Sequence, residues 1–264
     1  MERKQKRVLA MGDMHCGHVA GLTPPKWQYR RESEDAYQKQ FGEMQHHEWA
    51  WYSKLMEKLQ PIDILIVNGD CLDGKGEASG GTELITTDRR EQVLMAAECI
   101  NTAKAKSIYM TIGTPYHSGK EEDWEAVLAS EVGADKIGCH EWYDCNGLVF
   151  DCKHFVSGSI IPHGRHTAIA RDKLWNELYA IRGGQPAADV FLRSHVHYYN
   201  YCGEPDKLMI ILPALQVWSK YGAKRHSGII NTGVVSFDVV GKRDFAWQAH
   251  LLDMKAFAPV PIKV

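Results

Sequence analysis

Five short segments of this 264-residue chain carry Asp and His side chains in an arrangement typical of metal ligands. In chain order they are Gly12-Asp13-Met14-His15, Gly69-Asp70-Cys71-Leu72-Asp73, Gly113-Thr114-Pro115-Tyr116-His117, His163-Gly164 and His195-Val196-His197. Carboxylate oxygens and imidazole nitrogens bind hard or borderline divalent cations. Together the segments offer enough ligands for two cations that share one bridging carboxylate, an arrangement that activates water against a phosphorus centre.

Each segment taken alone has a simpler explanation. A Gly-Asp pair after a strand is a common turn, and this explains Asp13 and Asp70 equally well. Two His residues separated by one residue lie on the same side of an extended segment, where they can pack in a core as well as bind a metal. A lone His before Gly, such as His163, can simply be a loop residue. The ordered set of five favours the metal interpretation.

The elements of the first half of the chain place the first three segments at strand ends. Buried strands are predicted at 7–11, 62–67 and 107–112, and each runs directly into Gly followed by polar residues. Helical spacing predicts helices at 33–59 and 88–104, the second with Asp88 as its N-cap. A strand, helix, strand order favours right-handed crossovers and a parallel sheet, which brings the motifs to one edge.

The second half of the chain is rich in predicted strands and indicates a second sheet. Asn146-Gly147 is a strong hairpin turn between 141–144 and 148–157. Helices are expected at 121–131 and 167–182, and further strands at 188–192, 208–212, 228–240 and 245–252. We expect a single domain over 1–264, with a helical insertion at 19–60 and a C-terminal strap at 253–264.

Composition excludes several classes of protein. The net charge is −2, so the whole chain does not attract a polyanion. Its seven Cys form no C-x-x-C pair, which argues against a disulfide framework or a structural zinc site. The apolar run after the basic start is too short for a signal peptide, and no stretch approaches the roughly 20 apolar residues of a membrane span. We therefore expect a soluble, cytoplasmic protein.

With its motifs in this order, the chain resembles the calcineurin-like metallophosphoesterases, and among them the small members of phage or prophage type. Their pattern is D-x-H, G-D-x-x-D, G-N-H-[DE], a lone His and G-H-x-H, and the resemblance spans about residues 7–250. It implies an α/β fold, a four-layer α/β/β/α sandwich of two mixed β-sheets flanked by helices.

The resemblance also implies a role for each site residue. The first metal would be bound by Asp13, His15 and His197, and Asp70 would bridge to a second metal completed by His163 and His195. The third motif departs from the family, because Thr114 stands in place of Asn and two residues separate it from His117. A Thr hydroxyl is a poorer ligand than an amide oxygen, so Thr114 predicts a weaker second site.

Three further residues are candidates for substrate binding: Arg165 and His166, which follow His163-Gly164, and His18. His117 is the candidate general acid for the leaving oxygen. Asp70 is assigned to catalysis as well as to metal binding.

The expected function is metal-dependent hydrolysis of a phosphodiester or a monoester, with the phosphodiester favoured. Two divalent metal ions are the expected cofactors, with Mn²⁺ favoured and Fe, Zn or Ni also compatible. The expected partner is a phosphoester substrate, including a nucleotide or a nucleic acid. Two alternatives remain: a DNA or RNA nuclease of the same fold, and a non-catalytic metal-binding scaffold with an incomplete second site.

Overall fold

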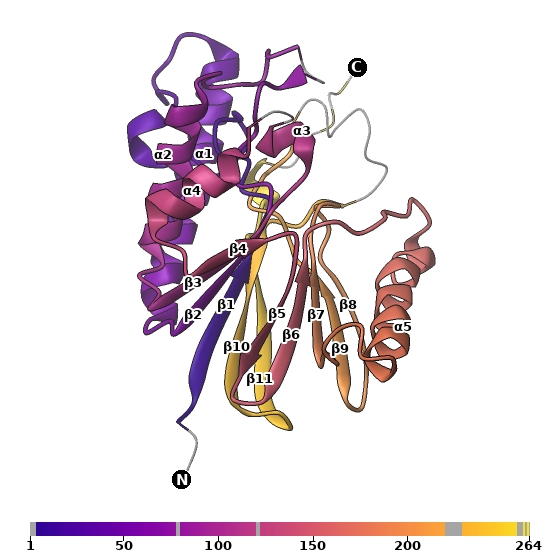
Figure 1. Ribbon diagram of the computed structural model, residues 1–264. Helices are drawn as coiled ribbons and strands as arrows, with labels where there is room; N and C mark the ends of the chain where they lie inside the picture. The colour runs from indigo at the N-terminus through magenta and orange to yellow at the C-terminus, as the bar shows by residue number, and fades with distance from the viewer. Residues whose placement is uncertain are drawn as a thin grey trace.

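The computed structural model describes residues 4–77, 80–119, 122–219, 229–257, 261 and 263. Two mixed β-sheets face each other, and helices cover the outer side of each sheet (Figure 1). The predicted α/β/β/α sandwich is therefore confirmed. Among the described residues, none of the helices combines the length and the apolar character needed to cross a bilayer.

The first sheet has six strands in the order β11-β10-β1-β2-β3-β4. The bounds are β1 Lys6–Met11, β2 Ile64–Asn68, β3 Ser107–Thr111, β4 Lys136–Gly138, β10 Gly233–Gly241 and β11 Asp244–Leu251. β1 to β4 pair in parallel, whereas β10 and β11 add to the β1 edge as antiparallel strands. The three predicted strands of the first half are thus confirmed, and they are neighbours in one sheet.

Three long helices cover the outer face of this sheet. They are α1 (Ala36–Leu59), α2 (Arg89–Thr102) and α4 (Trp124–Val132). Each begins after an Asp whose carboxylate accepts hydrogen bonds from backbone N–H groups of the first turn: Asp35, the predicted Asp88, and Asp123. A single-turn helix, α3 (Pro115–Ser118), was not predicted. The predicted helices therefore form where the sequence places them, with ends shifted by a few residues.

The second sheet has five strands in the order β5-β6-β7-β9-β8. The bounds are β5 His140–Cys145, β6 Leu148–Lys153, β7 Val190–Arg193, β8 Asn200–Glu204 and β9 Lys207–Ile211. The hairpin predicted at Asn146-Gly147 joins β5 to β6, and both turn residues have positive φ, as a two-residue hairpin turn requires. β6, β7 and β9 pair in parallel.

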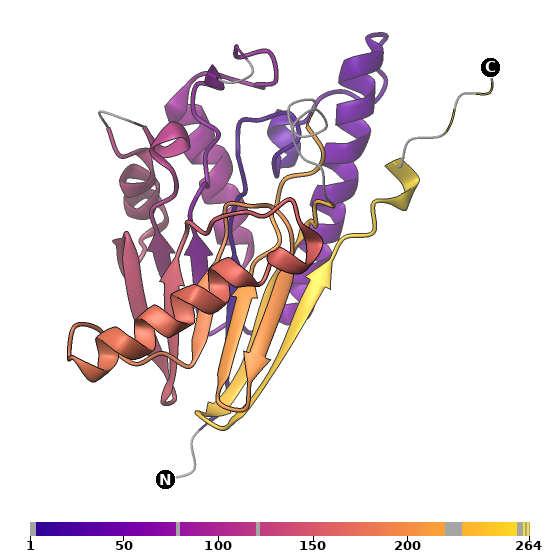
Figure 2. The same cartoon turned by 90° about the vertical axis from the view of Figure 1, so that its right-hand side faces the viewer.

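The hydrophobic core has three layers that follow from alternation along the strands. In β1, Leu9 and Met11 face the helices, whereas Val8 and Ala10 face the second sheet. Helix α5 (Thr167–Ile181) packs on the outer face of the second sheet, as Figure 2 shows. Because both faces of both sheets are covered, the parallel strands are apolar on both sides, and polar residues begin only where the strands end.

The predicted internal divisions of the chain stay predictions. The insertion expected at 19–60 contains the short helix η1 (Pro25–Trp27) and α1. The strap expected at 253–264 includes the short helix η4 (Lys255–Phe257), and most of its remaining residues lie outside the described part of the chain. Residues 121 and 228, at the starts of a predicted helix and strand, also lie outside it.

Candidate metal centre

The candidate ligands lie just beyond the carboxyl ends of strands from both sheets. The residues at these positions are Asp13 after β1, Asp70 after β2, Thr114 after β3, His154 after β6 and His195 after β7. Parallel strands of one sheet end at one edge, and here the two sheets bring two such edges together. The centre is therefore built on rigid strand ends, which position side chains accurately.

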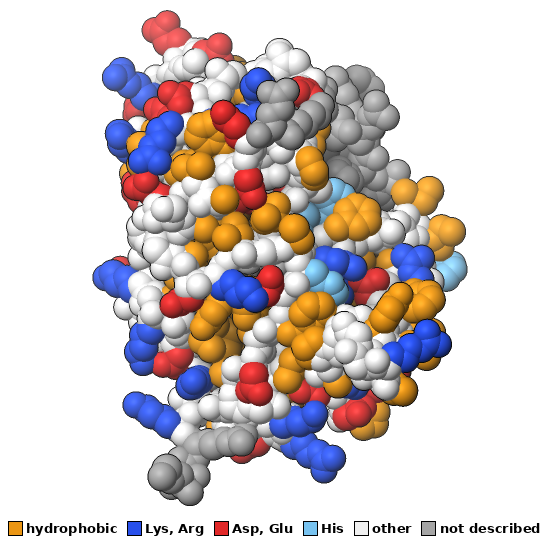
Figure 3. Space-filling model, viewed as in Figure 1, with side chains coloured by type: hydrophobic (Ala, Val, Ile, Leu, Met, Phe, Trp, Pro, Cys, Tyr) orange, Lys and Arg blue, Asp and Glu red, His pale blue; other side chains and the backbone are white. Residues whose placement is uncertain are grey.

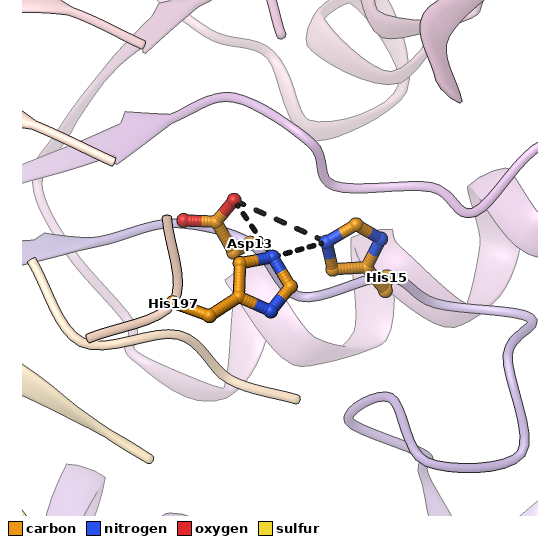
Figure 4. A group of neighbouring side chains, drawn as sticks. All are labelled: Asp13, His15 and His197. Atoms are coloured by element: carbon orange, nitrogen blue, oxygen red, sulfur yellow. Dashed lines mark hydrogen bonds and ion pairs between the residues drawn. The ribbon is translucent and has the colours of Figure 1, made fainter. Parts of the chain in front are cut away.

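The first group of ligands consists of Asp13, His15 and His197, whose ligand atoms lie within 4.8 Å of one another. Oδ1 of Asp13 is 3.9 Å from Nε2 of His15 and 3.5 Å from Nε2 of His197. Figure 4 shows the three side chains pointing toward one another from two separate loops. The group is the one predicted for the first metal.

The tautomer of His15 is fixed by its neighbour. Its Nδ1 lies 3.0 Å from Oδ1 of Asp73, an acceptor, so Nδ1 carries the proton. Burial lowers the pKa of His15 to about 4, which keeps the ring neutral. Nε2 of His15 is therefore unprotonated and carries a free lone pair, and it lies 3.1 Å from Nε2 of His197. A lone pair held in this way is the usual state of a metal-binding imidazole.

The second group consists of Asp70, His154 and His195. Nδ1 of His154 donates to the carbonyl oxygen of Asn68 at 2.7 Å, and Nε2 lies 2.9 Å from Oδ2 of Asp70. This Nε2 is buried, and Asp70 is its close partner. Burial lowers the pKa of His154, but the charges of Asp70 and Asp13 outweigh it and raise the pKa to about 10. The contact therefore requires a positive charge, supplied by a proton or by a cation.

Asp70 lies between the two groups. Besides His154, it shares a third group with His15 and His117, so it can reach imidazoles on both sides. Its Oδ1 accepts hydrogen bonds from the backbone N–H of Thr114 at 2.6 Å and from the Thr114 hydroxyl at 3.1 Å. Thr114 therefore orients Asp70, and the position of Asp70 suits the predicted bridge.

The backbone at the ligands is held in an unusual conformation. Seven described residues other than Gly have clearly positive φ, and five of them are candidate ligands: Asp13, His15, Asp70, His195 and His197. Such residues are uncommon outside Gly, and they cluster at functional sites because the surrounding structure must hold them. The local fold thus favours the geometry of the site over relaxed turns.

A buried carboxylate locks two of the site loops together. Oε1 of Glu125, in the first turn of α4, accepts from the N–H of Cys71 at 2.8 Å, and Oε2 accepts from that of Gly113 at 2.5 Å. Only Gly fits at position 113, because a Cβ there would collide with Asp70. Burial, followed by the charge of Asp70, raises the pKa of Glu125 to about 7. Sequence reasoning did not find this residue.

The donor set fits divalent cations. The first and second groups together hold two carboxylates and four imidazoles. Two of these imidazoles, His15 and His154, have their Nδ1 proton committed to an acceptor outside the group. Hydrogen bonds of this kind select the tautomer that offers Nε2 to a metal. Oxygen and nitrogen ligands together suit manganese, iron, zinc or nickel.

His163 does not take the position predicted for it. It is exposed on the short helix η3 (Pro162–Gly164), outside the three ligand groups, and His154 stands beside Asp70 and His195 instead. The strand was expected to continue to residue 157, which placed His154 inside it and left His163 as the next candidate. β6 in fact ends at Lys153, so His154 is another polar residue directly after a strand, and that signal could have identified it.

The other predicted residues lie around the centre. His117 is in α3, and its Nδ1 donates to the carbonyl oxygen of Asp73 at 2.9 Å. His18 is buried, and its Nδ1 accepts from the N–H of Ala20 at 3.0 Å. Arg165 lies over the ring of Tyr198, with Cζ 4.3 Å from the centroid. His166 is exposed before the first turn of α5. None of these contacts tests a role in substrate binding.

No family model matches the sequence, and no curated protein matches it. Among solved structures, the chain is similar to an archaeal phosphodiesterase (14% identity, 92% of this chain and 99% of that chain, TM-score 0.45). It is also similar to a predicted phosphoesterase from Streptococcus pneumoniae (9% identity, 89% of this chain and 84% of that chain, TM-score 0.39). A third similar structure is Vps29 of Entamoeba histolytica complexed with Zn²⁺ (11% identity, 94% of this chain and 94% of that chain, TM-score 0.47).

None of these three is described as a phage protein, so the phage type stays a prediction. At such low identities and TM-scores, the similarities support no statement about activity. The centre itself consists of His and Asp groups able to hold metal ions, at the strand ends of two facing sheets.

Proposed function

We propose that this protein is a metal-dependent phosphoesterase that hydrolyses phosphodiesters in preference to monoesters. The observation that carries the proposal is the pair of adjacent groups, each with one carboxylate and two imidazoles, linked through Asp70. Asp13, His15 and His197 would hold one cation, and Asp70, His154 and His195 the other. Cations bound there would activate water and neutralise charge on the phosphoryl oxygens.

The chain itself supplies orientation. Asp73 and the carbonyl oxygen of Asn68 fix the imidazoles of His15 and His154 through Nδ1, so each ring can turn only one nitrogen into the centre. The backbone N–H of His195 donates to both oxygens of Asp13, at 3.2 and 3.0 Å, which fixes that carboxylate. The ligands therefore need little rearrangement to bind cations, and preorganisation of this kind lowers the cost of catalysis.

His117 is the proposed general acid. Its Nδ1 donates to the carbonyl oxygen of Asp73 and also lies 3.5 Å from Oδ1 of that residue, so these two contacts orient the ring. Nε2 is then the atom that gives a proton to the leaving oxygen. We expect His117→Gln to slow the hydrolysis of esters with poor leaving groups by about 100-fold and to leave activated nitrophenyl esters much less affected.

The preference for a diester rests on charge. A monoester brings two negative charges at neutral pH and a diester one, so a monoester site needs additional cationic side chains. Lys153 directly precedes the ligand His154, and Arg193 lies two residues before the ligand His195. Both are already paired with carboxylates: Lys153 with Asp172 at 3.1 Å, and Arg193 with Asp151 and Asp172 at 2.8 Å.

The test compares His154→Ala with His163→Ala in protein supplied with manganese. We expect His154→Ala to lose one of two bound metal ions and more than about 100-fold of the rate on bis(p-nitrophenyl) phosphate, because a direct ligand is removed. His163→Ala should keep both metal ions and the full rate, because His163 is exposed and lies outside the ligand groups. Asp70→Asn should be as inactive as His154→Ala.

The assignment is wrong if the wild-type protein binds two metal ions and hydrolyses neither bis(p-nitrophenyl) phosphate nor p-nitrophenyl phosphate, or if Asp70→Asn retains the full rate. Single-stranded DNA serves as a third substrate. Hydrolysis of DNA far faster than of a dinucleotide would replace the proposed small diester with a nuclease substrate.

A further inference from the structure

An exposed aromatic ring stands directly against one of the proposed ligands. The ring of Phe155 lies 4.8 Å from the ring of His195, with the two planes tilted by 42°. Phe155 is 52% exposed, and the side chain of His195 is 34% exposed. The two rings therefore form a surface that a molecule bound at the metal centre can reach.

Phe155 is exposed between two buried neighbours. His154 before it and Val156 after it are both buried, whereas the Phe155 side chain faces solvent. The carbonyl oxygen of His154 accepts a hydrogen bond at 2.8 Å from the N–H of Ser194, which anchors this segment beside the residue that precedes His195. The position of the Phe155 ring is thus fixed by the same strand ends that position the metal ligands.

Exposure of this ring is costly unless something covers it. Burying a Phe side chain is worth about 1.5–3 kcal/mol, and about half of that is forgone here. Scattered single apolar residues at a surface are ordinary, but two more exposed side chains, Ile160 and Ile161, follow in the same loop. In Figure 3, hydrophobic side chains lie directly beside exposed His side chains on this face of the molecule.

The chemistry of this edge points to the group that covers the ring. Lys153 and Arg193, the described cations beside the ligands, are paired with carboxylates, whereas Phe155 presents an aromatic face at this edge. Planar rings stack on such a face with a gain of about 0.5–1.5 kcal/mol beyond the area buried. Nucleobases do the same, at about 1–3 kcal/mol each.

Building on the proposed function, we propose that Phe155 is a specificity-determining residue that stacks with a planar aromatic substituent of the phosphoester, an aryl group or a nucleobase. The phosphoryl group is held at the metal centre, and the ring of the substituent lies on Phe155 beside His195. The site then selects aromatic esters over alkyl or sugar esters.

Binding of phosphonates tests this without turnover, because their phosphorus–carbon bond is not hydrolysed. Calorimetry on the manganese-loaded protein compares phenylphosphonate with methylphosphonate. We expect the phenyl compound to bind roughly tenfold more tightly to the wild type. The preference should fall below about twofold in Phe155→Ala and in Phe155→Leu, which keeps an apolar side chain but lacks the ring. Trp175→Ala, equally exposed on α5, is the matched control and should keep the preference.

A second pair of ligands, the phosphonate analogues of AMP and of ribose 5-phosphate, distinguishes a nucleobase from an aryl group as the substituent that stacks on Phe155. A gain from adenine that disappears in Phe155→Ala assigns the substituent to a nucleoside, whereas loss of the phenyl gain alone assigns it to an aryl ester. Equal binding of the phenyl and methyl compounds to the wild type, or a preference that survives Phe155→Ala, overturns the inference and leaves the proposed function standing. If neither phosphonate binds but the wild type hydrolyses bis(p-nitrophenyl) phosphate, the inference fails and the proposed function stands. If that hydrolysis is also absent, both fail.

Discussion

Binding of the second metal ion should release a proton from His154. In the metal-free protein its pKa is about 10, because its Nε2 lies 2.9 Å from Asp70 while its Nδ1 is committed to Asn68. A cation at the second group has to displace the Nε2 proton. His15 differs, because burial lowers its pKa to about 4 and its Nε2 carries no proton to displace at neutral pH.

The size of the effect follows from the shift. At neutral pH, two to three pH units below the pKa of His154, displacement of the proton costs about 3–4 kcal/mol, a loss of about two to three orders of magnitude in apparent affinity. The apparent affinity of the second group for manganese should therefore rise about tenfold for each pH unit, or about 100-fold between pH 7 and pH 9. Binding to the first group should gain nothing from His15 over this range.

Titration calorimetry in buffers of different ionisation enthalpy measures both the affinity and the number of protons released. The wild type should show one binding event with a strong dependence on pH and the release of about one proton. His154→Ala should remove that event, whereas His15→Ala should remove the other one. Two events with the same flat dependence on pH, or a pH-dependent event that survives His154→Ala, would refute the reasoning about this histidine.

Three further predictions concern the residues that support the centre. The interaction that raises the pKa of His154 stabilises the metal-free protein fully below about pH 6.5, and this stabilisation is lost as the pH rises through about 10. Thermal unfolding in a chelator should therefore show that the free energy of unfolding falls by about 1.4 kcal/mol per pH unit in this range, a decline that His154→Gln should lack. Glu125→Gln turns an amide N–H₂ toward a backbone N–H, so the free energy of unfolding, measured with denaturant, should fall by about 1–3 kcal/mol. Manganese binding should also weaken, and an unchanged metal affinity would contradict a role of Glu125 at the centre. Gly113→Ala drives a Cβ into Asp70 and should abolish activity and binding of the second metal ion. The control Gly133→Ala has open space at its Cβ, so it should cost only about 1–2 kcal/mol of backbone strain and keep both the activity and the binding of the second metal ion.

Much of the centre could be predicted because its ligands follow strands that the sequence marks clearly. β1 and β2 are short apolar runs that end in Gly-Asp, and such a change from apolar to polar is visible without any tertiary information. The hairpin at Asn146-Gly147 is equally local, since only residues that tolerate positive φ fit it. Asp13, His15 and His197 were therefore predicted as one group, and the structure brings them together.

The residues that could not be predicted depend on contacts between distant parts of the chain. Glu125 is an ordinary acidic residue in the first turn of a helix, and only the packing of α4 places its carboxylate between Cys71 and Gly113. β4 and β8 are short strands of mostly intermediate or exposed residues, so they lack the apolar run that identifies a buried strand. Their assignment depends on pairing with a neighbour.

Local periodicity and ligand type are enough to place Asp and His side chains at several strand ends and to show that their chemistry suits divalent cations. Which histidine joins the second group follows from the fold. His154 and His163 are both single His residues after the hairpin, but β6 ends at Lys153 and pairs in parallel with β7, which places His154 beside His195 and Asp70. A ligand set is defined by which strand ends meet, and that depends on pairing between segments far apart in the chain.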